Sequence, residues 1–259
     1  MPKSNSSEPA EARAASSSGG DGEPGAQYTA VADNVGQILR ASLGQVFGMH
    51  PWHGVPLGDE APDVTNIYIE MLPTDTLKYE LDKATGILRV DRPQRFSSVC
   101  PEPYGFMPQT FCGERVAEYC MQRTGRDDIA GDEDPLDVLL LTEKHVTHAN
   151  IFCRAMPIGG LRMLDGEEAD DKIIAILAGD SSYGYWRDIS QCPSLMVERF
   201  KHYFLTYKQA PDSQRNVCEI THVYGAEEAR EVVRRAHEDY LARYGELAAL
   251  LKQVRETIV

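Results

Sequence analysis

The chain has 259 residues, enough for one large domain or two small ones. Its 40 acidic and 26 basic residues give a net charge of −14, which argues against a nucleic-acid backbone or an anionic membrane as partner. The charge favours cations, or an anionic ligand that arrives with cations. No apolar run approaches the roughly 18 residues of a membrane span, and six cysteines without a C-x-x-C pair predict reduced thiols in the cytosol.

The N-terminal quarter divides into a tail and an extension. Residues 1–26 contain no large apolar side chain and no signal-peptide core, so they are predicted to be disordered. Apolar residues recur at helical spacing over residues 28–48, which predicts a short amphipathic helix that docks on the domain or on a neighbouring subunit. The next loop carries His50 and His53. A structural role is favoured there over metal ligation, because Pro51 precludes helical spacing and no cysteine is near.

Short strands are predicted to follow, with helices appended at the C-terminal end. Alternation and turn residues place strands at 64–70, 77–81, 87–90, 138–141, 151–156, 173–178 and 217–224. Three prolines and a glycine exclude a helix over residues 100–111, and residues 113–130 form a polar segment. Helices are predicted at 195–208 and from 226 onward. Short strands followed by late helices suggest a small barrel rather than a parallel sheet.

Residues 131–141 form the most distinctive stretch, with four acids within six residues followed at once by an apolar run. An extended backbone would put Asp132 and Asp134 on one face, and Asp137 would enter the buried strand. Crowded carboxylates repel one another unless a cation lies among them, and hard oxygen ligands suit Mg²⁺ or Mn²⁺. The alternative is a solvated acidic loop, which the adjoining buried strand disfavours. An EF-hand fails because Leu136 and Asp137 stand at its fifth and sixth positions.

The acidic stretch and its surroundings resemble the family I soluble inorganic pyrophosphatases. The family signature stands here as Asp132-Glu133-Asp134-Pro135-Leu136-Asp137-Val138. Around it, in order, are Glu70, Lys78-Tyr79-Glu80, Asp91-Arg92, Pro101, Tyr104-Gly105, Asp165, Asp170, Lys172 and Tyr207-Lys208. The loop at 50–54, the segment at 113–130 and residues 236–240 are most similar to the chlamydial-type branch.

The resemblance implies a mainly β fold with appended α-helices, built on a five-stranded OB-type Greek-key barrel. The pyrophosphatase domain would span residues 63–259, with the barrel core at about 64–210 and the C-terminal helix at 226–258. Residues 27–62 would be an extension. The implied reaction is hydrolysis of inorganic pyrophosphate, bound as its metal complex, to two orthophosphates. Several Mg²⁺ ions would be needed, with Mn²⁺ or Zn²⁺ as substitutes, in a cytoplasmic homo-oligomer, either a dimer or a hexamer.

The family pattern also implies a role for each matching residue. Metal ligands would be Asp132, Asp137, Asp165, Asp170 and Glu80, with Glu70 supporting the water network. Asp134 would take the proton from the attacking water. Charge on the phosphoryl groups would be neutralised by Lys78, Arg92, Lys172 and Lys208, while Tyr104 and Tyr207 donate hydrogen bonds.

Two positions depart from the family pattern. Cys100 stands where many members carry Tyr, and Gly166 stands where an acid often follows the residue that matches Asp165. Two other functions remain as alternatives: an acidic module that binds divalent ions without catalysis, and a Mg²⁺-dependent phosphoesterase acting on nucleotides or polyphosphate.

Overall fold

The computed structural model describes residues 36, 38, 42, 49–209 and 218–258. Ala41–Val259 form one compact unit. The predicted disordered tail over residues 1–26 lies outside the described residues. So does the predicted helix over residues 28–48, except that positions 36, 38 and 42 are helical.

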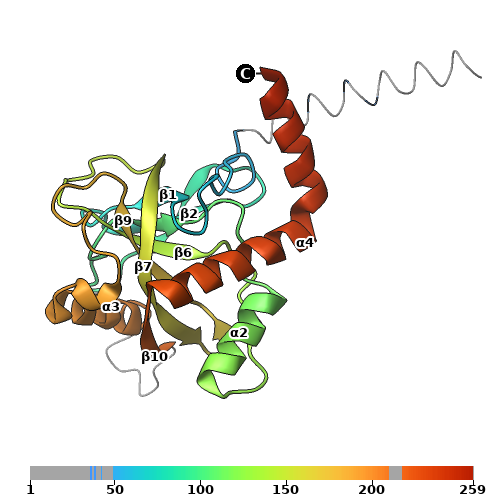
Figure 1. Ribbon diagram of the computed structural model, residues 1–259. Helices are drawn as coiled ribbons and strands as arrows, with labels where there is room; N and C mark the ends of the chain where they lie inside the picture. Colours follow the sequence, from blue (N-terminus) through green and yellow to red (C-terminus); the bar gives the residue numbers. More distant parts are fainter. Residues whose placement is uncertain (1–35, 37, 39–41, 43–48, 210–217, 259) are drawn as a thin grey trace, which may run out of the picture. The chain divides into compact units, whose positions relative to one another are not determined.

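Within the described residues, five strands pair in a closed ring (Figure 1). Their order is β1 (Thr65–Met71), β4 (Tyr104–Phe106), β6 (Asp137–Leu141), β9 (Lys172–Leu177) and β7 (Ile151–Asp165), after which β7 pairs with β1 again. The pair β6–β9 is parallel and the other pairs of the ring are antiparallel. The predicted five-stranded OB-type barrel with appended helices is confirmed.

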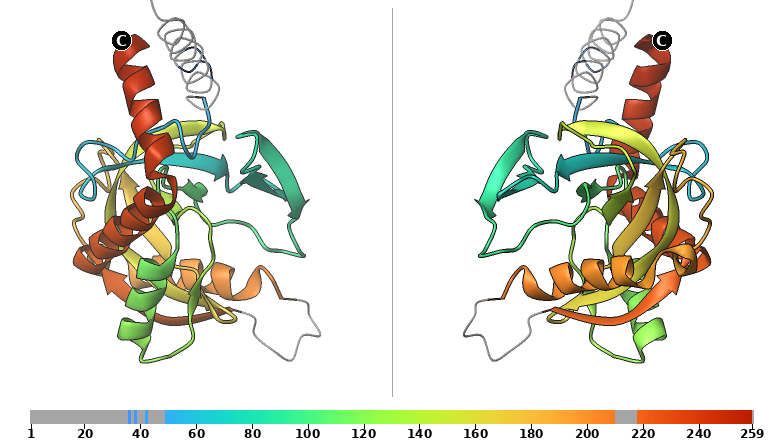
Figure 2. Two further views of the ribbon diagram at one scale, coloured as in Figure 1. Left: turned by 90° about the vertical axis from the view of Figure 1, so that its right-hand side faces the viewer. Right: turned by 90° about the vertical axis from the view of Figure 1, so that its left-hand side faces the viewer.

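The strands β2 (Leu77–Leu81) and β3 (Leu88–Pro93) form a separate two-stranded sheet that projects beside the barrel (Figure 2). Their connection is the predicted turn at 82–86, in which the Asp82 carboxylate accepts the Thr85 N–H at 2.9 Å. Gly86 has a φ of +71°, a backbone conformation that glycine adopts without strain. The side chains of β2 and β3 therefore approach the barrel from a separate sheet.

The prediction for the strand that begins at residue 151 is too short. The alternation predicts a strand at 151–156, whereas β7 runs to Asp165 and bends at a register shift between Pro157 and Gly159. A proline and two glycines normally end a strand, but a bulge lets the pairing continue around them. The far half of β7 pairs with β10 (Cys218–Gly225) and with β8 (Glu168–Ala169), which in turn pairs with β5 (Ala130–Gly131).

The polar segment at 113–130 contains a helix that the sequence does not indicate, α2 (Glu114–Thr124). The Asp239 carboxylate accepts the N–H groups of Gly113, Arg115 and Val116, so it caps this helix from a distant part of the chain. From residue 49 onward, the other helices in the described part of the chain are η1 (Ile189–Gln191), α3 (Ser194–Thr206) and α4 (Ala226–Ile258), the last of which bends at Tyr244 (Figure 1). Among the described residues, no helix combines the length and apolarity that a membrane crossing demands.

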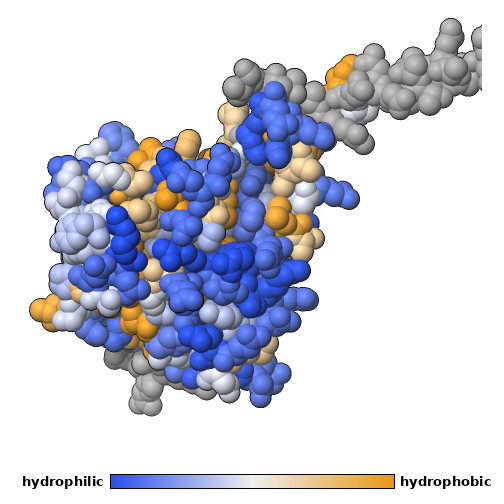
Figure 3. All heavy atoms as spheres, in the orientation of Figure 1, coloured by the Kyte–Doolittle hydropathy of each residue, from blue (hydrophilic) through white to orange (hydrophobic). Residues whose placement is uncertain are grey.

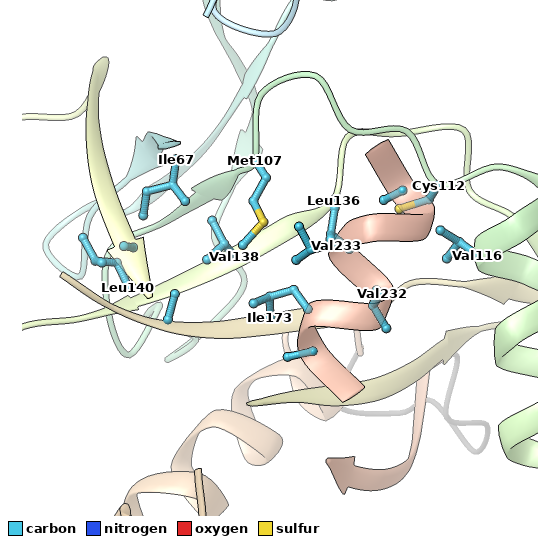
Figure 4. Close-up of a cluster of buried hydrophobic side chains, with 14 of the residues drawn as sticks. Ile67, Met107, Cys112, Val116, Leu136, Val138, Leu140, Ile173, Val232 and Val233 are labelled. Atoms are coloured by element: carbon cyan, nitrogen blue, oxygen red, sulfur yellow. The ribbon is translucent and has the colours of Figure 1, made fainter. Parts of the chain in front are cut away.

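Alternate residues of β6 enter two different clusters of the core. Val138 and Leu140 pack on the side of α2 and α4, whereas Leu139 and Leu141 pack on the side of α3. Figure 4 shows the first of these clusters, with Val232 of α4 among the strand residues. The strand is therefore buried on both faces, as predicted. The face that carries α4 and α2 in Figure 1 is mainly hydrophilic (Figure 3).

Candidate active site

A cleft of about 200 Å³ lies where the β2–β3 hairpin meets the start of β6 and the segment after α3. All the predicted site residues except Arg92 line this cleft: Glu70, Lys78, Glu80, Tyr104, Asp132, Asp134, Asp137, Asp165, Asp170, Lys172, Tyr207 and Lys208. Positions that lie more than 130 residues apart in the sequence are thus brought to one place by the closure of the barrel.

Arg92 is placed outside the lining. It lies opposite Lys78 in the β2–β3 pair, and its guanidinium contacts the Asp91 carboxylate. The guanidinium carbon also lies 5.9 Å from the centre of the Tyr207 ring. Arg92 is therefore at the edge of the cleft rather than within it.

The acidic loop does not adopt the extended backbone that was predicted for Asp132 and Asp134. Glu133 between them has a φ of +59°, and the Asp132 carboxylate accepts the Asp134 N–H at 2.9 Å. The expectation of a shared strand face is wrong, because this local hydrogen bond stabilises a turn instead. A Cβ atom at Gly131 would lie 2.1 Å from the Cys112 carbonyl oxygen, so the loop is pressed against the neighbouring backbone.

Asp137 and Lys172 are paired across β6 and β9, and the Lys172 ammonium contacts the carboxylates of both Asp137 and Asp170. Lys172 is only 2 % exposed. Burial alone would lower the pKa of its ammonium, but Asp137 and Asp170 raise that pKa well above the usual range. Lys172 therefore brings a permanent positive charge into a cleft dominated by acids.

Two buried carboxyls in the cleft have raised pKa values although a lysine acts on each, Lys172 on Asp132 and Lys78 on Glu70. Burial, with Asp170 as the next cause, raises the pKa of Asp132 to about 8. Burial and then Asp137 raise the pKa of Glu70 to about 8, although the Leu81 N–H donates to Glu70 at 2.7 Å. Ionisation of either carboxyl is thus unfavourable in the protein without a bound cation. A divalent cation beside the carboxyl would make the ionised form favourable.

The remaining cleft residues form ion pairs and buried phenols. The Lys78 ammonium contacts Glu80, and the Lys208 ammonium contacts Asp165. Burial raises the pKa of Tyr207 to about 12, so its hydroxyl stays protonated and can donate a hydrogen bond. Burial also raises the pKa of Tyr104, which has the same consequence.

The donor set of this cleft fits hard divalent cations, because every acidic ligand offers carboxylate oxygen and no thiol or imidazole takes part. Across the part of the chain that the structure describes, no three histidine, cysteine or acidic side chains are grouped as a metal site. Lys172 lies between Asp137 and Asp170 instead, where its ammonium supplies the positive charge.

Sequence reasoning assigned no site role to six further residues that line the cleft: Trp52, Leu81, Lys83, Phe106, Pro135 and Glu168. Lys83 belongs to the turn of the β2–β3 hairpin, and its ammonium contacts the Asp134 carboxylate. No local pattern marks it, since a lysine in a turn is usually solvated. Glu168 begins β8, within the acid-rich stretch before β9, and that run of acids is the available signal.

Comparison with known proteins identifies the family. Residues 67–241 match the sequence profile of the inorganic pyrophosphatases. The chain is 52 % identical over 195 residues to the inorganic pyrophosphatase of Chlamydia trachomatis, covering 74 % of this chain and 93 % of that protein. The chain belongs to the inorganic pyrophosphatase family.

Further relatives agree with this membership. A soluble inorganic pyrophosphatase of Solanum tuberosum is 40 % identical over 173 residues, covering 67 % of this chain and 73 % of that protein. The crystal structure of the inorganic pyrophosphatase of Thermus thermophilus aligns with a TM-score of 0.62 at 27 % identity, covering 73 % of this chain and 98 % of that one. The predicted resemblance to the soluble pyrophosphatases and to their chlamydial members is confirmed.

The two departures from the family pattern lie beside the cleft rather than in its lining. Cys100 is fully buried and packs in the cluster of α3, and its thiol lies 3.2 Å from the Glu102 carbonyl oxygen. Gly166 has a φ of +65°, so glycine suits the turn between β7 and β8. Both substitutions leave the acidic and basic side chains of the cleft in place.

Proposed function

We propose that the chain hydrolyses inorganic pyrophosphate to two orthophosphates by attack of a metal-activated water, with Mg²⁺ as the metal and Mn²⁺ or Zn²⁺ as substitutes. The observation that carries this proposal is one cleft holding buried, closely spaced carboxyls beside the four ammonium groups of Lys78, Lys83, Lys172 and Lys208. When bound, the divalent ions would neutralise the tetra-anionic substrate and lower the pKa of the attacking water.

Asp132, Asp137 and Asp170 are proposed to hold the first metal, and Asp137 also reaches a second. Asp165 with Asp170, and Glu80, would hold ions that arrive with pyrophosphate. The raised pKa of Asp132 supports this assignment, since a carboxyl that ionises reluctantly alone gains most from a cation beside it. Glu70, near the end of β1, would hold water molecules through its carboxyl group.

Asp134 is proposed to accept the proton of the attacking water. Its side chain lines the cleft and is 48 % exposed, so it can meet a water molecule without being a buried structural group. Its backbone is fixed by the hydrogen bond from its own N–H to Asp132. A base held in this way loses little entropy when the proton moves.

The basic side chains are proposed to stabilise the charge that develops as the bridging oxygen leaves. Lys78, Lys172 and Lys208 each contact a carboxylate of the cleft and can exchange that contact for a phosphoryl oxygen. Tyr104 and Tyr207, which stay protonated, would donate hydrogen bonds to the same oxygens. Arg92, at the edge, would reach the outer phosphoryl group.

The domain limits, assembly and compartment are also proposals. Residues 1–26 would be a disordered tail, residues 27–62 an extension that docks on the barrel or on a partner subunit, and residues 63–259 the catalytic domain.

Exposed apolar side chains such as Phe96, at 75 % exposure, support a homo-oligomer, either a dimer or a hexamer. Six free cysteines support the cytoplasm. The substrate is proposed to be the metal complex of pyrophosphate, with no nucleic acid or membrane as partner.

The decisive experiment measures phosphate release from pyrophosphate with and without Mg²⁺ in the intact chain and in Asp134→Asn. Loss of the general base is expected to lower the rate by about 10²–10⁴-fold. Glu133→Gln is the matched control, because this neighbouring acid is 69 % exposed and does not line the cleft. Turnover that survives Asp134→Asn would remove the role given to Asp134. No turnover with Mg²⁺, Mn²⁺ or Zn²⁺ would favour the metal-binding module instead.

A further inference from the structure

The loop at 49–54 lies outside the barrel, yet its ring side chains are buried. His50, Trp52 and His53 are between 2 and 5 % exposed. His53 faces α4, where its Nδ1 lies 2.9 Å from the Tyr240 hydroxyl. The His50 ring lies beside that of His53, with the ring centres 4.7 Å apart, and its Nε2 lies 3.1 Å from the Lys83 carbonyl oxygen in the turn of the β2–β3 hairpin. The two histidines of one loop thus connect it to two different parts of the molecule.

The hydrogen bonds of His50 define its tautomer. The Trp52 N–H donates to His50 Nδ1 at 3.2 Å, so this nitrogen carries no proton. Burial lowers the pKa of His50, which favours the neutral ring. The ring proton is therefore on Nε2, which donates to the Lys83 carbonyl oxygen at 3.1 Å. His50 is thereby a fixed donor to the main chain of Lys83.

The ring of His50 also packs against the face of the turn. A Cβ atom at Gly86 would lie 2.8 Å from His50 Cδ2, so the turn approaches the ring as closely as a glycine allows. The Gly86 N–H closes the turn on the Asp82 carbonyl oxygen at 2.8 Å. The position of the turn is therefore fixed by a hydrogen bond on one side and by van der Waals contact on the other.

The side chain that this turn presents to the cleft is Lys83, whose ammonium contacts Asp134. The side chains of Lys83 and Asp134 are 52 and 48 % exposed. The attraction within such an exposed ion pair is too weak to hold the two side chains in one position. The approach of the ammonium therefore depends on where the main chain of the turn is held. A lysine stem of four carbons has too much rotameric freedom to keep that position unaided.

We propose that His50 is a positioning residue of the active site, which acts through Lys83 by holding the hairpin turn so that the Lys83 ammonium stays beside Asp134. The proposal rests on the function proposed above, in which Asp134 receives the proton. Lys83 keeps a positive charge next to that carboxylate, in the lining of the cleft that would bind pyrophosphate. A residue outside the barrel, in the loop that precedes β1, thus takes part in building the cleft.

The test combines steady-state kinetics with a chemical probe of Lys83. His50→Phe is expected to lower kcat roughly tenfold, because a small displacement of a catalytic-site group has effects of this size or larger. Lys83→Met should lower kcat to a similar extent, and the double variant no further than Lys83→Met alone. His50→Gln, whose amide can still donate to the Lys83 carbonyl, should recover most of the rate.

His53→Phe is the matched control, since His53 is equally buried in the same loop and its ring hydrogen bond goes to Tyr240 of α4 rather than to the hairpin. Phenylalanine keeps a ring at this position, 4.7 Å from the centre of the His50 ring. His53→Phe should lower the melting temperature about as much as His50→Phe while kcat stays unchanged. Additive losses in the double variant, or an equal loss of kcat in His53→Phe, would overturn the proposal. The acetylation rate of Lys83, followed by mass spectrometry, should rise in His50→Phe and not in His53→Phe. The acetylation rate tests whether His50 holds Lys83 in place even in a chain that does not hydrolyse pyrophosphate. An acetylation rate of Lys83 that is unchanged in His50→Phe would overturn the proposal.

Discussion

Arg162 offers the sharpest test of how the buried charges near the cleft are balanced. The side chain is fully buried, with Nη1 2.9 Å from an Asp171 oxygen and Nη2 2.8 Å from a Glu228 oxygen. Its guanidinium lies 5.1 and 5.0 Å from the rings of Tyr119 and Tyr224. Arg162→Met keeps much of the volume of the side chain and removes its charge, so it leaves the buried Asp171 without its main partner.

The expected cost follows from this burial. Breaking a buried ion pair from one side destabilises a protein by about 3–5 kcal/mol, since the remaining charge is left unpaired. A domain of ordinary stability has about 5–15 kcal/mol in all, so Arg162→Met should remove a third or more of it.

The loss should also depend on pH. Burial raises the pKa of Asp171 to about 6 even with Arg162 present, and the variant should raise that pKa further. The folded state then binds a proton that the unfolded state releases, so stability falls as pH rises through the folded-state pKa. The deficit of Arg162→Met should therefore be larger at pH 8 than at pH 5.

Denaturant unfolding at pH 5 and pH 8 measures both effects. The double variant Arg162→Met with Asp171→Leu should recover about 2–3 kcal/mol of the summed single losses, because it removes both charges together. Arg126→Met is the control, since Arg126 forms an exposed pair with Glu219 and should cost less than about 1 kcal/mol. Additive losses in the double variant, or a cost of Arg162→Met no greater than that of Arg126→Met, would refute the reasoning.

Three further outcomes are expected. Burial lowers the pKa of His53 to about 4, so the stability that its neutral ring contributes is complete above the usual pKa of 6.5 and is lost as pH falls toward 4. His53→Phe should therefore reduce the loss of stability between pH 6.5 and pH 4 by up to about 3 kcal/mol. The same fall of melting temperature with decreasing pH in the variant and in the unchanged chain would contradict this. Asp239→Ala removes the acceptor for three backbone N–H groups at the start of α2 and should lower the free energy of unfolding in denaturant by about 1–2 kcal/mol. Glu238→Ala is the control, because this neighbouring side chain is exposed and should cost less. Equal costs of the two variants would argue against the cap. Deleting residues 1–48 should lower the melting temperature or the number of subunits measured by light scattering, and no change in either would contradict the docking proposed for residues 28–48.

The local patterns of the sequence sufficed for the β2–β3 hairpin and for β6. The alternation at 77–81 predicts β2 with its observed bounds, and the turn residues at 82–86 predict the hairpin connection. The uninterrupted apolar run after Asp137 predicts a strand buried on both faces, as β6 is. The residues that gather in the cleft were predicted by the resemblance to the soluble pyrophosphatases, since each of these acids and lysines taken singly looks like an ordinary surface charge.

Tertiary structure alone decided the features that depend on partners distant in the sequence. The pairing of β6 with β9 puts Lys172 between Asp137 and Asp170, and no local spacing expresses that register. The helix α2 takes its cap from Asp239, more than a hundred residues away, and the glycines of β7 end a strand in isolation but bend it within a closed barrel. Lys83 looks like an ordinary turn lysine until the loop at 49–54 folds against it. Local propensity sets which segments can be strands or helices, whereas barrel closure and burial set which side chains meet, and those contacts make the site.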